Sequence, residues 1–502
     1  MMITLFSTAL GAEVTFQRLG FGTEADNGVF SEDIDGDGTR ALIALGRGRI
    51  SIYRPPAGEK SPYSEQAEVL TTGASAYFAC VADVLPAKGK EILLLTPAGV
   101  SCFAHEDARR HSAKPQSLIA CETLLGAPAV RGALAAARGA DVDILPWNFA
   151  FDADGDGRDD LLIPTAQGIA VYLQKAPGQF APPITLPVFP GMRLAVIAGP
   201  HGDDITPHTL SARSTLPLRF ELNLPKIESR DINKDGKPDI ICGDVYFAQK
   251  AAGGFETVPG PVPPEALPEA TRGPMDIDGD GRLDRLLVEH DLSDPFNLIT
   301  RVRVFMAQKD GKLPERPIRT IVGQNILVYG DFPVHDFLKD GTLGFAMLKV
   351  DPAPFPHRYK PGQVEGDLDF YLFDRDKNLY PRSPVYRKPI RMDFKIDPAQ
   401  AMNVSLGEHY LGNAIRLGGD YNADGRPDLL VWEKSDELAI YFNTGRRNEL
   451  FSRRPDIWLD KIPAFGRLGI ADLNGDGASD IILYGPKDRP NKVVAVYISR
   501  LR

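Results

Sequence analysis

A nine-residue acidic pattern recurs along the whole chain and constrains its fold more than any other feature. The pattern places Asp at the first position, Asp or Asn at the third, Asp at the fifth, Gly at the sixth and Asp at the ninth. Complete copies begin at Asp152, Asp231, Asp276, Asp420 and Asp472. A sixth copy, from Asp33, differs by ending in Ala41. A unit that recurs in this way sets the architecture of a chain, because each copy is one supersecondary element.

Each acidic loop is followed by two short strand-like runs. The first is apolar, as in IILY from Ile481, and the second ends in an aromatic residue, as in IAVY at Tyr172. Such runs are typical of short buried strands. Two worn copies, which begin at Asp83 and Asp336, keep the strands but lose part of the acidic pattern. The repeating unit is therefore loop, strand, turn, strand, and the chain contains eight of them.

Eight such units predict an all-β fold and, within it, a β-propeller, whose blades are four-stranded sheets around a central channel. Eight blades are favoured; seven is the alternative if one worn unit is not a blade, and a linear array of β modules is the alternative architecture. The last unit stops at VAVYISRLR, while the N-terminal AEVTFQRLG is an unmatched strand. We therefore expect the N- and C-terminal strands to pair and close the ring, which removes an exposed sheet edge. Residues 13–502 would then form a single propeller domain.

Other segments of the chain are less regular. We interpret residues 105–145, 190–225 and 350–400 as insertions between or within blades. Residues 1–12, MMITLFSTALGA, resemble the apolar core and small-residue end of a secretory signal but lack a basic start. A truncated signal and an ordinary terminal strand therefore both stay open. No apolar run reaches the roughly 18 residues of a membrane-spanning helix.

The cysteines are four in number and form no CxxC motif, so neither a zinc site nor a thioredoxin-type site is indicated. We expect separate buried thiols. In an exported protein the alternative is a disulfide between Cys80 and Cys102. The full set is Cys80, Cys102, Cys121 and Cys242.

The acidic loops place hard oxygen donors at alternate positions, so that they converge on one point while the glycine permits a sharp turn. Calcium fits this donor set best, because magnesium prefers a rigid octahedron and zinc prefers thiol or imidazole ligands. An EF-hand is excluded, because its twelfth position requires a Glu, and residues such as Ile163 stand there. The expected ligands of about five to six Ca²⁺ ions are the side chains at positions one, three, five and nine and the backbone carbonyl at position seven. They are Asp33, Asp35 and Asp37; Asp152, Asp154, Asp156, Arg158 and Asp160; Asp231, Asn233, Asp235, Lys237 and Asp239; Asp276, Asp278, Asp280, Arg282 and Asp284; Asp420, Asn422, Asp424, Arg426 and Asp428; and Asp472, Asn474, Asp476, Ala478 and Asp480.

The repeated DxDGDGxxDLL unit resembles the FG-GAP or VCBS repeat, the blade unit of integrin α-subunit head domains and of many exported bacterial proteins. The resemblance covers nearly the whole chain. It implies a propeller with one calcium ion per intact blade, held at loops away from the central channel. The loop at Asp33 is a weaker expected site, and none is expected at Asp83 or Asp336. The departures from the pattern are Ala41, Leu85, Lys88, Leu338 and Gly344.

The charge balance fits this interpretation. The chain has 57 Lys and Arg against 67 Asp and Glu, for a formal net charge of −10. The acidic loops account for this excess, and a net negative charge argues against nucleic-acid binding. Calcium is roughly millimolar outside cells, which is enough to fill weak extracellular sites. The loops therefore predict export to the periplasm, the cell surface or the medium.

A catalytic function has little support in the sequence, which contains no GxSxG, HExxH or phosphate-loop motif. A local cluster of His201, Asp203, Asp204 and His208 reads as a solvated loop rather than a metal site. Polysaccharide lyases on eight-bladed calcium propellers resemble this repeat and imply clustered basic and aromatic residues on one face. The candidates here are His357, Arg358, Tyr359, His409 and Tyr410.

Binding is the favoured function, because a propeller presents loops from every blade on one face and can recognise a ligand without chemistry. Candidates for stacking on a sugar are Trp147, Trp432 and Trp458, of which the first two lie in apolar runs typical of blade core. The sequence thus predicts an exported adhesion or binding scaffold with a glycan or protein ligand at a propeller face. A calcium-dependent polysaccharide lyase is the alternative. Neither nucleic acid nor a transmembrane segment is expected.

Overall fold

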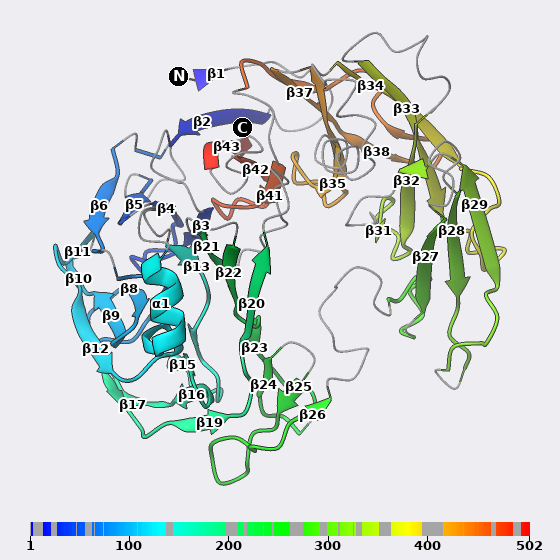
Figure 1. The fold of residues 1–502 in the computed structure, drawn as a ribbon. Helices are drawn as coiled ribbons and strands as arrows, with labels where there is room; N and C mark the ends of the chain where they lie inside the picture. Colours follow the sequence, from blue (N-terminus) through cyan, green and yellow to red (C-terminus); the bar gives the residue numbers. More distant parts are fainter. Residues whose placement is uncertain are drawn as a thin grey trace.

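The regular structure is almost entirely β, with strands β1 to β43, the helix α1 (Pro128–Ala136) and the 3-10 turn η1 (Leu124–Gly126) among the described residues (Figure 1). None of the described helices has the length and apolarity that a membrane span needs. The structure is a computed structural model and describes residues 2–501 except 4–13, 22–27, 47, 56–62, 65, 74, 108, 137–143, 197–208, 214–217, 234, 243–244, 262–274, 283, 292–298, 310–311, 325, 328–333, 351–362, 394–414, 435, 463–467 and 485–492.

The first four repeats each fold into one antiparallel sheet. In each sheet the acidic loop joins the first strand to the second. The first sheet contains β3 (Gly28–Glu32), β4 (Ala41–Gly46), β5 (Arg49–Tyr53) and β6 (Glu68–Thr71). The second contains β7 (Phe78–Ala82), β8 (Glu91–Thr96), β9 (Gly99–Phe103) and β12 (Gln116–Ala120), with β13 (Leu145–Pro146) beside β7. The third contains β14 (Ala150–Phe151), β15 (Asp160–Thr165), β16 (Gly168–Tyr172) and β19 (Ile184–Leu186), and the fourth contains β23 (Ile227–Arg230), β24 (Asp239–Cys242), β25 (Val245–Phe247) and β26 (Gly260–Pro261).

The last four repeats form the remaining blades. The fifth contains β27 (Arg285–Asp291), β28 (Ile299–Phe305) and β29 (Arg319–Gln324). The sixth contains β30 (Ile326–Leu327) and β31 (Val334–His335), both paired with β32 (Gly344–Val350), then β33 (Gln363–Leu372) and β34 (Tyr386–Asp393). The seventh contains β35 (Ile415–Gly419), β36 (Asp428–Lys434), β37 (Glu437–Tyr441) and β40 (Ile457–Leu459). The eighth contains β41 (Leu468–Ala471), β42 (Asp480–Tyr484), β43 (Val493–Leu501) and β2 (Val14–Gly20), with β1 (Met2–Ile3) outside β2.

The blades follow one another around a ring in chain order, and the sixth and seventh are joined into one nine-stranded sheet by a parallel pair of Asp393 in β34 with Lys434 in β36 (Figure 1). The predicted β-propeller is thus confirmed, with one blade for each of the eight repeats. The predicted closure is also confirmed. Strand β2 pairs antiparallel with β43, from Val14 opposite Leu501 to Gly20 opposite Ala495. Strand β2, near the start of the chain, and β43, the last strand, therefore lie side by side in one blade.

The insertions are confirmed in one place and in part of a second. The described strands β20 (Gly191–Val196), β22 (Leu218–Asn223) and β21 (Thr209–Arg213) form a separate sheet, which lies on the inner side of the ring in Figure 1. Residues 105–145 include η1, α1 and the hairpin of β10 (His105–Asp107) and β11 (Arg110–His111), but residues 116–120 are β12, a strand of the second blade. The interpretation of 350–400 as an insertion is wrong for residues 363–393, which are the long strands β33 and β34 of the sixth blade. Smaller hairpins are β17 (Gln174–Ala176) with β18 (Gln179–Phe180) and β38 (Asn443–Arg446) with β39 (Glu449–Phe451).

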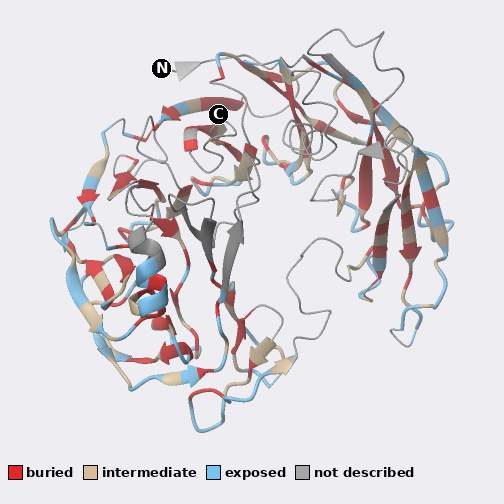
Figure 2. Ribbon diagram, viewed as in Figure 1, coloured by how far each residue is buried: buried red, intermediate tan, exposed pale blue. Residues whose placement is uncertain are grey.

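Buried residues run along the blade strands, and exposed residues gather at turns and outer strands (Figure 2). The apolar clusters cross from blade to blade. One contains Phe78, Ile163 and Phe247 from the second, third and fourth blades. Burial of this kind is the main favourable term in folding, and it holds each blade against its neighbour.

The cysteines are free thiols. Cys80 and Cys102 both pair with Leu93, from the two strands that flank β8, so a whole strand separates them and the alternative disulfide is not formed. Burial raises the pKa of the Cys102 thiol to about 11 and that of Cys242 to about 12. Cys121 is half-buried rather than buried. These thiols are neutral and unreactive at ordinary pH.

Candidate metal sites

The carboxylate at the first position of the acidic loop accepts hydrogen bonds from backbone amides later in the loop and so stabilises the turn. In the third blade, Asp152 Oδ1 accepts hydrogen bonds from the Gly155 and Asp156 amides at 2.7 and 3.0 Å, and Oδ2 accepts from the Gly157 amide at 2.9 Å. The bond from the sixth-position amide to the first-position carboxylate recurs in every copy with Asp and Gly at these positions, including the worn copy at Asp336. The turn is therefore formed by the loop itself.

The backbone conformation at the sixth position of the loop explains why this residue is glycine. Its φ lies between 81° and 90° in these seven loops. This left-handed region costs an L-residue about 1–2 kcal/mol and costs glycine little. The residues are Gly38, Gly157, Gly236, Gly281, Gly341, Gly425 and Gly477.

The ninth-position carboxylate fixes the loop to its blade. Asp160 is fully buried, and it accepts hydrogen bonds from the Ala153 amide at 3.0 Å and from the Gln174 amide, just after the aromatic strand, at 2.7 Å. Asp239, Asp284, Asp428 and Asp480 do the same in their blades. Burial is the main cause that raises the pKa of Asp160 and of Asp480 to about 7.

Glu91 takes this ninth position in the worn second loop, a residue that the sequence interpretation missed. Its Oε2 accepts hydrogen bonds from the Val84 and Leu85 amides at 3.0 and 3.1 Å. The sequence contains a sign of this role, because Glu91 lies eight residues after Asp83, just as Asp160 lies eight residues after Asp152. Its other oxygen, Oε1, is buried without a hydrogen-bond partner among the described residues, so Glu91 holds its own loop but does not form the bond to the end of the aromatic strand.

The carboxylates at alternate positions converge as expected in two loops. Oxygen atoms of Asp152, Asp154 and Asp156 lie within 4.8 Å of one another, and so do those of Asp276, Asp278 and Asp284. Asp154 Oδ1 is buried and accepts no hydrogen bond from the described residues. Burial, followed by the negative charge of Asp156, raises the pKa of Asp154. A buried carboxylate oxygen without a donor, facing other carboxylates, fits a hard cation such as Ca²⁺.

Three loops carry Asn at the third position, and its amide bridges the loop. Asn233 Nδ2 donates to Asp235 Oδ2 at 3.2 Å, and Asn422 and Asn474 make the same bond to Asp424 and Asp476. At the seventh position the arginine side chains of Arg158, Arg282 and Arg426 contact the fifth-position carboxylate. These ion pairs lie near the surface, where such pairs contribute little to stability.

The first loop differs from the other acidic loops, because its third-position carboxylate, Asp35, contacts basic side chains. This buried carboxylate accepts hydrogen bonds from Arg54 Nε at 2.9 Å, and it lies 3.2 Å from His105 Nε2 and 3.5 Å from Arg109 Nε. Arg54 also contacts Glu68 at 2.6 Å. The carboxylate that is a predicted ligand thus already has cations beside it, and Ala41 supplies no ninth-position oxygen.

The loops also join neighbouring blades. The Lys90, Leu343 and Ser479 amides donate to Ile34, Ile277 and Asp420 carbonyls of the preceding loops at 2.7, 2.8 and 2.7 Å. Side-chain amides add to these contacts: Gln249 Nε2 donates to the Asp154 carbonyl at 2.8 Å. Whatever orders one loop therefore also orders the contact with the next blade.

The other sequence candidates do not form a second site. Trp147 is buried and donates to the Pro225 carbonyl at 3.1 Å, and Trp432 is fully buried, so both belong to the core. Trp458 is half-buried, with Lys434 Nζ 5.7 Å from its ring centre. The remaining candidates, His201, Asp203, Asp204, His208, His357, Arg358, Tyr359, His409 and Tyr410, lie outside the described residues.

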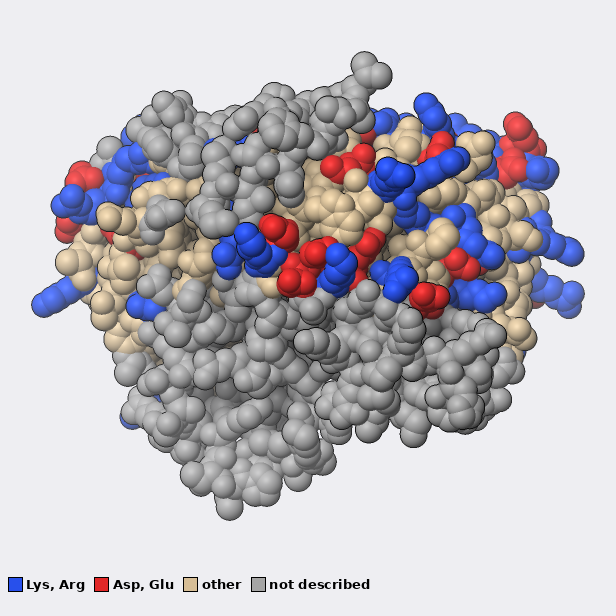
Figure 3. All heavy atoms as spheres, turned by 90° about the horizontal axis from the view of Figure 1, so that it is seen from above, with Lys and Arg blue, Asp and Glu red and all other residues tan. Residues whose placement is uncertain are grey.

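Charges on the described surface are mixed. Figure 3 shows many Lys and Arg side chains on the right of that view, with Asp and Glu between them. Ion pairs between neighbouring strands also occur among the described residues, as between Arg387 Nε and Asp369 Oδ1 at 2.6 Å.

The fold and the loops together define a β-propeller with acidic hairpin loops. Residues 420–483, which run from the seventh acidic loop to β42, match the family model of the FG-GAP-like repeat. This segment is thus an FG-GAP-like repeat, as the repeated pattern predicts. No curated protein matches it.

Several solved structures are similar in overall arrangement. They include a lectin from Agrocybe aegerita whose structure concerns recognition of non-reducing terminal N-acetylglucosamine (14% identity, 99% of this chain and 98% of that one, TM-score 0.35). Others are the Vibrio cholerae biofilm matrix protein Bap1 (11%, 99% and 86%, TM-score 0.26) and the β-propeller domain of Vanderwaltozyma polyspora Nup133 (8%, 100% and 100%, TM-score 0.30). These similarities are too weak to assign a function.

Proposed function

We propose that this protein is a calcium-stabilised β-propeller that acts outside the cytoplasm as a binding scaffold for glycans or proteins. The observation that carries the proposal is the recurrence of one preorganised acidic loop, in which the buried Asp154 Oδ1 has no hydrogen-bond donor among the described residues. Oxygen-only donors at this spacing suit Ca²⁺ better than Mg²⁺ or zinc.

The proposed number of calcium ions is five, in the third, fourth, fifth, seventh and eighth blades. The first loop is left out because Arg54, His105 and Arg109 surround Asp35 where an ion would need its oxygens. The worn loops are left out because Leu85 and Leu338 replace the third-position ligand. In the first loop, basic side chains of the protein thus neutralise the acidic cluster, whereas in the five other loops bound Ca²⁺ ions would do so.

The role proposed for calcium is structural. Without an ion, the carboxylates of one loop repel one another, which is part of the cause that raises the pKa of Asp154 and Asp278. A bound ion removes this repulsion, and its binding free energy adds to the stability of the folded state. Because each loop contacts the next blade, the stabilisation should extend to the ring.

Calcium titration of chelator-treated protein by calorimetry and native mass spectrometry tests the proposal. Wild type should bind five ions, and its melting temperature should fall markedly in excess chelator. Asp154→Ala should reduce the count to four, because it removes the third-position ligand of one loop. The matched control Asp83→Ala lies in a worn loop and should leave the count at five. A melting curve that excess chelator does not change would contradict structural calcium.

The scaffold function is tested by glycan and protein arrays with and without chelator. Calcium-dependent binding without cleavage supports it. The same polysaccharides should give no new absorbance at 235 nm, the signal of unsaturated ends; its appearance would favour the lyase alternative. No contact among the described residues favours that alternative, since its candidates, from His357 to Tyr410, lie outside them.

A further inference from the structure

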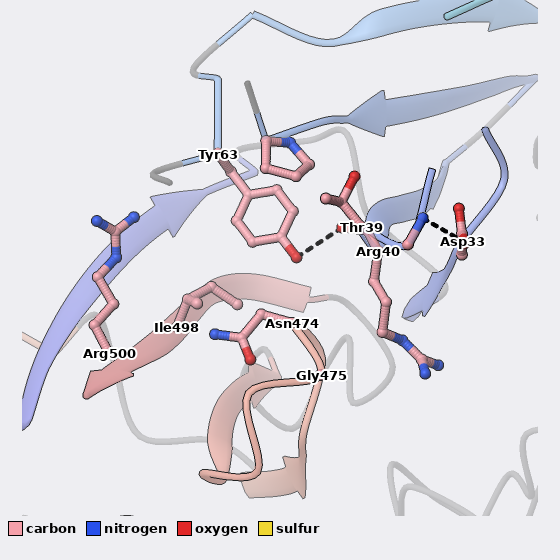
Figure 4. A pocket seen from close by; sticks show the side chains of 10 residues that line it. Asp33, Thr39, Arg40, Tyr63, Asn474, Gly475, Ile498 and Arg500 are labelled. Atoms are coloured by element: carbon pink, nitrogen blue, oxygen red, sulfur yellow. Dashed lines mark hydrogen bonds between the residues drawn. The ribbon is translucent and has the colours of Figure 1, made fainter. Parts of the chain in front are cut away.

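A cavity of about 280 Å³ lies where the first and last blades meet. One wall comes from the first acidic loop with Pro55 and Tyr63, and the other from the eighth acidic loop and β43 (Figure 4). Its size is just below that of sites for drug-sized ligands, which suits a single sugar ring. The lining residues used below are Asp33, Thr39, Arg40, Tyr63, Ile498 and Arg500.

Tyr63 is held rigidly in this cavity. Its backbone carbonyl accepts a hydrogen bond from Gln17 Nε2 at 3.1 Å, and its amide donates to Gln17 Oε1 at 3.0 Å. Its phenol donates to the Arg40 carbonyl at 2.9 Å (Figure 4). An aromatic side chain fixed at three points loses little entropy when a ligand packs against it. The ring and Ile498 give the cavity an apolar wall.

Two guanidinium groups flank this wall, and in Figure 4 Arg500 and Arg40 extend on opposite sides of the Tyr63 ring. Arg500 Nη2 donates to Gln17 Oε1 at 2.7 Å, so the glutamine that holds Tyr63 also holds this arginine. Arg40 is held by Ser31, to whose hydroxyl and carbonyl it donates at 3.1 Å. Both arginines are therefore positioned before any ligand arrives.

Asp33 is the one carboxylate among the described lining residues, and both of its oxygens accept hydrogen bonds. Asp33 accepts hydrogen bonds from the Asp37 and Gly38 amides at 3.2 and 3.0 Å. Thr39 donates its hydroxyl to Asp37 and keeps lone pairs for a ligand hydroxyl. An apolar ring wall, a hydroxyl acceptor and guanidinium forks form the donor set that recognises a sugar carrying a carboxylate.

We propose that this seam cavity binds one acidic sugar unit, a uronate, with the sugar ring against Tyr63 and its carboxylate on Arg500 or Arg40. The proposal rests on the scaffold function above and names a ligand class and a place for it. It requires neither catalysis nor a partner chain.

Saturation-transfer NMR and calorimetry in millimolar calcium provide the test. The probes are disaccharides that end in glucuronate, galacturonate or mannuronate, each compared with its neutral counterpart. Wild type should bind at least one uronate at least tenfold more tightly than the matching neutral sugar, because a charged hydrogen bond contributes about 1.5–3 kcal/mol. Equal binding of the neutral sugars, or no binding of all three uronates at millimolar concentration, would overturn the proposal.

Two variants locate the site. Arg500→Gln should weaken uronate binding roughly tenfold or more. Thr39→Phe should abolish it by filling the cavity, while its backbone bond to Asp37 is kept. Arg303→Gln is the matched control, since Arg303 on β28, in the fifth blade, has a half-exposed ion pair with Glu289 on β27. A uronate affinity that the two cavity variants leave unchanged would overturn the assignment.

These results are separable from the proposed function. The calcium count and the chelator effect on melting do not involve Arg500 or Thr39 as ligands, so they stand if uronates fail to bind. If Thr39→Phe lowers the melting temperature, Arg500→Gln with a wild-type melting curve decides the outcome. A glycan bound with equal affinity by wild type and Arg500→Gln would support the scaffold and overturn the cavity.

Discussion

At the scale of single residues, the ninth-position carboxylates carry the most structure. Each is buried and accepts amide hydrogen bonds from its own loop and from the end of the second strand run. The repeated spacing predicted these residues as metal ligands. Their role as a brace between loop and strand could not be predicted, because it depends on where the chain returns after the aromatic residue.

Replacing Asp160 by Ala should lower the free energy of unfolding by about 2–4 kcal/mol, because it leaves the Ala153 and Gln174 amides buried without acceptors. Chemical denaturation in saturating calcium and in chelator measures this. The loss should persist in chelator, since the brace does not need the ion. A loss seen only in calcium would show that Asp160 acts only as a ligand.

The pH dependence of stability should change with calcium. Burial raises the pKa of Asp160 and Asp480 to about 7 from an ordinary 3.8, so protonation of these groups stabilises the folded state. That stabilisation is complete below pH 4 and is lost as pH rises through 7. Melting curves in chelator should therefore move to lower temperature between pH 5 and 8. In saturating calcium the shift over this range should be smaller or reversed.

Arg54 is the residue whose loss should harm the first blade most. Arg54→Gln leaves Asp35 and Glu68 without their closest cation and should cost about 3–5 kcal/mol, as for a broken buried ion pair. Unfolding of this variant should show the loss equally with calcium and with chelator. Rescue of its stability by calcium would mean that an ion can replace Arg54 in the first loop.

At the scale of elements, the loop and its two following strands were predictable, because the ligand spacing and the apolar runs are local in sequence. The sixth blade was harder. Strands β33 and β34 carry many charges, and these are compensated across the strands, as between Arg387 and Asp369. Charged residues of this kind obscure the alternation of apolar and polar residues by which a strand is recognised in a sequence, so the segment was interpreted as an insertion.

The turn at the sixth position gives a further prediction. Gly157→Ala forces an L-residue to a φ of 84° and should cost about 1–2 kcal/mol. It should also weaken calcium binding at that loop, because the Gly157 amide holds Asp152 in place. Gly132→Ala, in the exposed part of α1, is the control and should be neutral or slightly stabilising. Calorimetry and thermal melting distinguish the two.

At the scale of the whole molecule, closure of the ring was predictable from one missing strand at the end and one surplus strand at the start. Deleting residues 1–20 should remove β2 and expose the edge of β43. We expect a lower melting temperature and self-association through that edge, measured by light scattering with chromatography. A monomer as stable as the full chain would show that the closing strand is dispensable. The seam cavity was not predictable, because its walls come from residues more than 400 positions apart, such as Tyr63 and Arg500.

The pairing of β2 with β43 has a mechanical consequence. These two strands share one sheet but no direct covalent connection, and the ends nearest the two chain termini, Val14 and Leu501, lie opposite each other in their seven-pair register. A pull on the two termini would therefore open the register from this pair, and the pairs would separate one after another rather than together. If the protein is tethered at one end and held by a ligand elsewhere on the ring, the separation of β2 from β43 determines the force at which the ring opens.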